Sequence, residues 1–79
     1  MYTDQMRRAF HSVGHFKPKS LKATLVDNDQ FLTLKVEESS FMLLPEEDKR
    51  RAIEYMVRAK KALEDNGAIV LLVREGGKE

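Results

Sequence analysis

Two spacings of hydrophobic residues divide the chain into helical and extended stretches. Between residues 3 and 13 hydrophobic residues recur every three or four positions, which predicts a short amphipathic helix. Over 21–26 and 30–36 they alternate with polar residues, which is the period of a strand. The run Asp27-Asn28-Asp29 between these two stretches is typical of a tight turn, so we expect a β-hairpin.

The longest helical pattern covers residues 45–65. Three acidic residues occupy its first turn, where the helix dipole favours anions, and Asn66-Gly67 is a typical helix end. The short apolar run 41–44 before this helix is predicted as a third strand. The run 68–73 after it is predicted as a fourth, and because it is apolar on both faces we expect it to be central or covered.

These elements predict an α+β fold with a single small domain over residues 1–75 and a flexible tail at 76–79. The expected order is α-β-β-β-α-β, giving a mostly antiparallel four-stranded sheet with the long helix packed on one face. Because a helix between two strands can return the chain to the same sheet, we expect the last strand to join this sheet.

Both faces of the predicted sheet are apolar. We expect the long helix to cover the face formed by Leu21, Ala23, Leu25, Leu32, Leu34 and Val36. On the opposite face, either Ile69, Leu71 and Val73 or Ala68, Val70 and Leu72 join the hairpin residues. A soluble monomer rarely leaves so large an apolar surface in water, so the N-terminal helix or another chain must cover it. The residues predicted at a partner interface are Val26, Phe31, Phe41 and Ile69.

Composition adds a reason to expect a partner. The chain has 79 residues and no cysteine, which excludes disulfides, thiolate metal sites and a cysteine nucleophile. A core of this size usually needs a disulfide, a metal or a partner chain for support, so we expect a homodimer or another protein partner. The absence of cysteine suits a reducing compartment, and no apolar run approaches the length of a membrane span. We therefore expect a cytoplasmic protein.

Residues that could carry chemistry are few. His11 and His15 have the spacing of two metal ligands on one helix face, but Gly14 lies between them and no third ligand is near in the sequence. The phosphate-binding and nucleophile motifs are absent. We therefore expect no catalytic activity, cofactor, metal or small-molecule substrate.

The net charge of +1 hides a local imbalance. Residues 1–22 carry five basic residues and one acidic residue, a net charge of +4, and the five are Arg7, Arg8, Lys17, Lys19 and Lys22. Such a strip is a candidate for phosphate contacts, so nucleic-acid binding is the alternative function. A solvated helix face followed by a polar linker accounts for the same residues.

The first five predicted elements follow the order found in double-stranded RNA-binding domains. The stretch 48–63 resembles the basic, alanine-containing second helix of that family. In that family lysines at the start of this helix meet phosphates, whereas this chain has Glu46-Glu47-Asp48 there. The resemblance therefore implies a topology and no inherited RNA binding.

Together, these features predict a small non-enzymatic protein that acts by protein–protein contact and self-associates. We expect an accessory or regulatory role, of the kind that small stand-alone chains have in phages and mobile elements.

Overall fold

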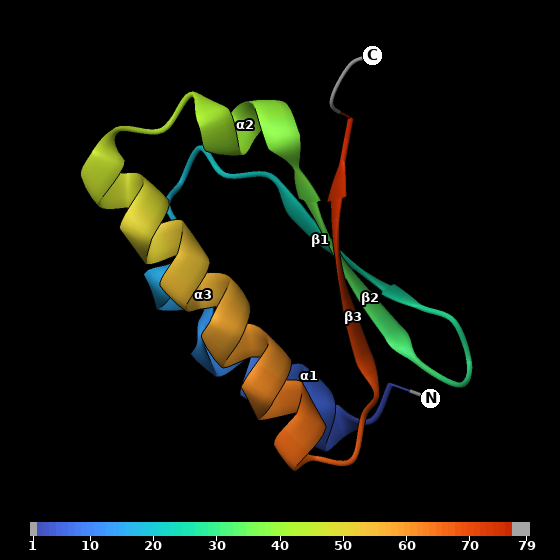
Figure 1. The fold of residues 1–79 in the computed structure, drawn as a ribbon. Coiled ribbons are helices and arrows are strands. Elements are labelled where there is room, and N and C mark those ends of the chain that lie inside the picture. Colours follow the sequence, from blue (N-terminus) through green and yellow to red (C-terminus); the bar gives the residue numbers. More distant parts are fainter. Residues whose placement is uncertain (1, 77–79) are drawn as a thin grey trace.

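All the long helices lie on one side of a three-stranded sheet in the computed structural model, which describes residues 2–76 (Figure 1). The elements are α1 (Asp4–Ser12), the 3-10 helix η1 (Gly14–Phe16), β1 (Ala23–Asp27), β2 (Leu32–Glu37), α2 (Glu38–Met42), α3 (Glu46–Asp65) and β3 (Val70–Glu75). The strand order is β1-β2-β3. Apart from Gly76, the predicted tail lies outside the described residues.

The predicted hairpin is confirmed. β1 and β2 pair antiparallel, with Leu25 opposite Leu34 at the centre. The turn is closed by the Asn28 N–H, which donates to the Phe31 carbonyl at 2.9 Å, and Asp29 adopts a left-handed conformation with φ of 68°. Asp and Asn tolerate this conformation, which explains why a turn forms at this acidic run.

The predicted third strand at 41–44 is wrong, because the first two residues of this run end helix α2 and the other two form a turn. Both edges of β2 are already occupied, one by β1 and the other by β3. In this conformation, the run turns Phe41 and Leu44 toward the core and leaves Met42 and Leu43 exposed. The Ser40 hydroxyl anchors the helix start, donating to the Glu37 carbonyl at 2.8 Å and accepting from the Lys22 N–H at 3.0 Å.

The sheet is therefore mixed, and the expected mostly antiparallel four-stranded arrangement is not formed. As expected, α3 returns the chain to the same sheet, and β3 pairs parallel with β2. Only two strands precede the long helix in the described residues, so the topological resemblance to double-stranded RNA-binding domains does not hold.

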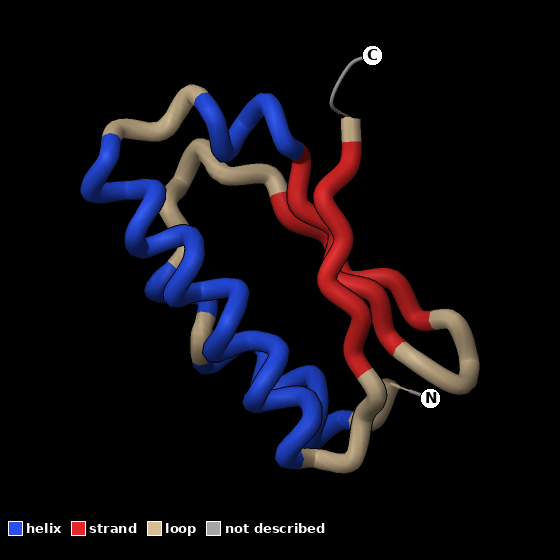
Figure 2. The backbone as a smooth tube through the Cα atoms, in the orientation of Figure 1, coloured by secondary structure: helices blue, strands red, loops and turns tan. Residues whose placement is uncertain are grey.

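The core lies between the sheet and α3, as predicted. Leu21, Leu32, Leu34 and Val36 are buried on the sheet side, against Ala52, Tyr55, Met56, Ala59 and Leu63 of α3. Helix α1 packs on this same side: Met6 is buried with Leu32 and Leu63, and the Phe10 and Tyr55 rings lie 6.3 Å apart. Figure 2 shows both helices on one side of the strands. The N-terminal helix therefore does not cover the second face of the sheet.

Candidate protein–protein interface

The strand β3 lies at an edge of the sheet, although its sequence is typical of a central strand. Val70 is buried, but Leu71, Leu72 and Val73 are 48%, 43% and 37% exposed. The sequence-based expectation that this strand is central or covered is wrong for the single chain. Such a strand is usually covered on both faces, so its exposure marks the candidate interface.

The register determines which backbone groups of β3 face the open edge. The Leu32 N–H donates to the Ile69 carbonyl at 2.8 Å, and Leu32 is aligned with Val70. In a parallel ladder, alternate residues of a strand bond to the neighbouring strand, so odd-numbered residues of β3 bond to β2. Val70, Leu72 and Arg74 therefore direct their N–H and C=O groups toward the open edge, where another strand can pair with them.

Natural edge strands usually carry features that prevent pairing with other chains, such as proline, bulges or charged residues. The first four residues of β3, Val70 to Val73, have none of these. Charge begins only at Arg74 and Glu75, which form ion pairs within the chain, Arg74 with Glu38 and Glu75 with Lys35, both at 3.5 Å. The apolar half of this edge is thus open to pairing.

The sheet surface turned away from the helices, here called the outer face, is also uncovered by any element among the described residues. The register places Val26, Thr33 and Leu71 in one row across this face, and Thr24, Lys35 and Val73 in the next. Leu71 and Val73 are thus the hydrophobic β3 residues on this face, with Ile69 directly before the strand, so the alternative set Ala68, Val70 and Leu72 does not lie there. Its apolar part lies near the hairpin turn, and its other end is charged.

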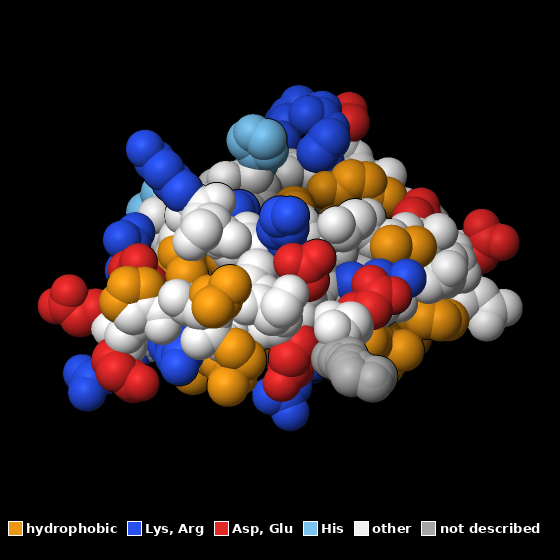
Figure 3. All heavy atoms as spheres, turned by 90° about the horizontal axis from the view of Figure 1, so that it is seen from above, with side chains coloured by type: hydrophobic (Ala, Val, Ile, Leu, Met, Phe, Trp, Pro, Cys, Tyr) orange, Lys and Arg blue, Asp and Glu red, His pale blue; other side chains and the backbone are white. Residues whose placement is uncertain are grey.

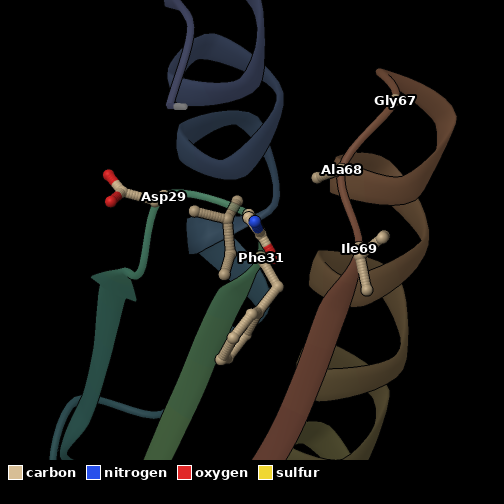
Figure 4. A pocket seen from close by; sticks show the side chains of 7 residues that line it. Asp29, Phe31, Gly67, Ala68 and Ile69 are labelled. Atoms are coloured by element: carbon tan, nitrogen blue, oxygen red, sulfur yellow. The ribbon is translucent and has the colours of Figure 1, made fainter.

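At the apolar end, the segment just before β3 and the hairpin turn enclose a small cleft of about 140 Å³. Figure 4 shows Phe31 and Ile69 on either side of it, with Gly67 and Ala68 above. Ligand pockets usually measure about 300–1,000 Å³, so this cleft fits a side chain from another protein better than a cofactor.

Helix α3 has a second exposed apolar surface. Its Tyr55 side faces α1, and Arg58 stacks on the Phe16 ring at 4.4 Å. With 3.6 residues per turn, Ile53 and Val57 lie on the flank of α3 turned away from α1, and they are 52% and 58% exposed. Figure 3 shows that hydrophobic side chains reach the surface in several patches among charged ones.

Three of the four residues predicted at the interface lie together. Val26, Phe31 and Ile69 are on the outer face near the hairpin turn. Phe41 is instead partly buried against the core, because α2 replaces the expected strand. The sequence reasoning missed the exposed edge at Leu71 to Val73 and the flank of α3. The strand with two apolar faces was the available signal, but its position in the sheet was unknown.

The five basic residues of the N-terminal segment do not form one strip. Arg7 is paired with Asp4 at 3.3 Å, and Lys22 lies in a cleft with Glu37 and Glu75. Lys17 donates to the Leu21 carbonyl at 2.8 Å. Arg8 is exposed on α1. Only Lys17 and Lys19 share a cleft, an open one of about 550 Å³ whose other basic residues are His15 and Arg51.

The two histidines lie on different helices, and neither belongs to a group of side chains that could bind a metal ion among residues 2–76. His11 is in the last turn of α1, whereas His15 is in η1, where its Nδ1 donates to the Ser12 carbonyl at 3.0 Å. Within residues 2–76, no three His, Cys, Asp or Glu side chains are placed to hold a metal ion. Nor does this part of the chain contain a helix with the length and hydropathy needed to cross a membrane.

Comparisons of the chain with protein-family models, with curated proteins and with solved structures found no match.

Proposed function

We propose that this chain is a small non-enzymatic protein that acts by protein–protein contact and associates with a second copy of itself. The observation that carries the proposal is β3, an uncharged apolar strand from Val70 to Val73 at an open sheet edge. Strands of this composition are normally central in a sheet, with a neighbour at each edge, and a second chain would provide the neighbour that β3 lacks.

The helices support the same proposal. Both α1 and α3 pack on one side of the sheet, so neither protects the outer face or the free edge of β3. The chain has no disulfide that could support its small core. Association with another copy is the usual remaining source of stability in a domain of this size, and two-fold dimers are the commonest assemblies. The lack of cysteine also suits the proposed cytoplasmic location.

Light scattering at low micromolar concentration tests the proposal, and we expect the mass of two chains. Leu72→Asp should reduce the mass to that of one chain, because it places a carboxylate in the middle of the exposed apolar run of β3, where the second chain is expected to pair. Gln5→Asp introduces the same group on an exposed position of α1 and should leave the mass unchanged. Far-ultraviolet circular dichroism checks that each variant folds. A wild-type protein with the mass of one chain under these conditions would contradict the proposal.

The cleft beside η1 supports a second candidate function, nucleic-acid binding. It gathers Lys17, Lys19 and His15 with Arg51 of α3, a residue outside the basic segment seen in the sequence. The cleft also contains Asp48, and Arg51 donates to the His15 carbonyl at 3.2 Å, so part of its hydrogen-bonding capacity is used within the chain. This is a smaller basic surface than the sequence suggested, and the proposal ranks second.

A further inference from the structure

We propose that two copies join antiparallel through their β3 strands into one continuous six-stranded sheet, with Leu72 on the two-fold axis. This inference rests on the proposed self-association and specifies its surface. It follows from three features of the single chain: the direction of the backbone groups in β3, the order of its side chains, and the apolar flank of α3.

The backbone groups restrict the possible registers. In an antiparallel pair, hydrogen-bonded residues lie directly opposite each other and exchange both bonds. Only Val70, Leu72 and Arg74 direct their groups to the open edge, so these residues must pair with one another across the axis. With the two-fold axis at Leu72, this residue pairs with Leu72 of the second copy, and Val70 of each copy pairs with Arg74 of the other. This register uses every outward N–H and C=O group of the strand.

The side chains favour this register over those with the axis nearer the C-terminal end of β3. With the axis at Leu72, Leu71 lies opposite Val73 of the second copy, and the two form an apolar cross-strand pair on the outer face. Moving the axis to Val73 would place Leu71 opposite Glu75. Moving it to Arg74 would place two arginines opposite each other, which is unfavourable because like charges repel.

The flank of α3 completes the surface. Leu72 points to the helix side of the sheet yet remains 43% exposed, since α3 covers it only in part. Helix α3 contacts β3, so the same axis brings the α3 helices of the two copies together above Leu72. Ile53 and Val57 lie on the flank that then faces the second copy. A specific interface buries about 800 Å² on each partner, more than one six-residue strand provides, so this flank is a necessary contribution.

Pairing of two outer faces is the competing arrangement, and the charges disfavour it. The end of the outer face farthest from the hairpin turn carries Lys35 and Glu75, which form an ion pair at 3.5 Å, beside Lys22 and Glu37. Stacking two such faces would remove these charged groups from water without a new partner for each. Pairing at the edge leaves them exposed.

Arg74→Pro tests the edge directly. The Arg74 N–H faces away from β2, so proline should preserve the ladder with β2 while removing an outward donor and blocking the approach of another strand. Arg74→Ala is the matched control, because it loses the same side chain and the same ion pair with Glu38 but keeps the N–H. By light scattering, we expect Arg74→Pro to have the mass of one chain and Arg74→Ala the mass of two.

Cross-linking provides a second test that does not depend on proline. The chain has no native cysteine, so Leu72→Cys introduces one thiol at the proposed axis. Opposed residues of paired strands have Cα atoms about 5.5 Å apart, within disulfide range, and mild oxidation should therefore link two copies. Thr24→Cys, on the opposite edge strand, should remain unlinked.

The outcomes separate the two proposals. If the wild-type protein has the mass of two chains and Arg74→Pro keeps that mass, or Leu72→Cys does not cross-link, then self-association stands but the β3 pairing is wrong. If the wild-type protein has the mass of one chain, both proposals are wrong.

Discussion

Tyr55 connects α1 to the rest of the core. Only 3% of the residue is exposed, and its ring packs near Phe10 of α1. Burial raises the pKa of the Tyr55 hydroxyl above its ordinary value of 10.0, because the phenolate would lose its hydration, and the nearby Tyr2 adds to this effect. Ionisation of this hydroxyl therefore destabilises the folded chain.

This pKa shift predicts a loss of stability at alkaline pH. The folded-state pKa is above the unfolded one, so the stabilisation is fully present below about pH 10 and decreases as the pH rises through the folded value. One such group changes the free energy of unfolding by at most about 1.4 kcal/mol per pH unit in that range. Urea denaturation between pH 8 and pH 11 (roughly the range in which tyrosine ionises) measures the effect.

Tyr55→Phe is the control for this prediction. It keeps the ring but removes the ionisable group, so stability should decrease less steeply above about pH 10 than in the wild-type protein. A part of the decrease should remain, because burial also raises the pKa of Tyr2. Equal slopes in the two proteins would show that Tyr55 ionisation does not limit alkaline stability.

At the scale of single elements, the stability of α1 depends on its N-cap residue, Thr3. The Thr3 hydroxyl accepts a hydrogen bond from the Met6 N–H at 3.1 Å, and Met6 is the buried residue of this helix. Loss of an N-cap typically costs about 1 kcal/mol. We expect Thr3→Ala to lower the free energy of unfolding by that amount in chemical denaturation. Thr3→Ser retains a capping oxygen and should stay within about 0.5 kcal/mol of the wild-type protein.

The elements with a long or regular pattern could be predicted from the sequence. The expected helix 45–65 matches Glu46–Asp65, and the two hairpin strands match within about two residues. The run 41–44 could not be assigned, because four consecutive apolar residues fit either a short helix or a strand. The outcome depended on the second edge of β2, which is occupied by β3, a segment far away in the sequence.

The part of the candidate interface that could be predicted is the part set by the alternation of hydrophobic and polar residues along the hairpin strands. Val26 and Phe31 follow from the period of the hairpin, and they lie on the outer face as predicted. Phe41 was predicted at the interface because the run 41–44 was predicted as a strand, whereas α2 turns this residue toward the core. The open edge at Leu72 required the strand order, which no local pattern contains, since β3 could equally have been inserted between two other strands.

For the whole molecule, the second candidate function leads to a distinct prediction. If the cleft beside η1 binds nucleic acid, Lys19→Ala and Arg51→Ala should weaken binding in an electrophoretic shift assay, and added salt should weaken it further. Arg7→Ala and Arg8→Ala alter basic residues that lie outside this cleft and serve as matched controls. An equal loss in all four variants would indicate a diffuse charge effect, and no binding even at low salt would contradict this candidate function.

The parallel pairing of β2 with β3 also affects how the chain folds. Leu32 pairs with Asp27, five positions before it, and with Val70, 38 positions after it. Closing the longer loop costs more chain entropy, so the hairpin can form quickly whereas β3 must dock late. Until it docks, one side of β2 and both sides of β3 are free to pair with other chains. Refolding should therefore give its best yield in dilute solution, where β3 reaches its own β2 before it meets that of another molecule.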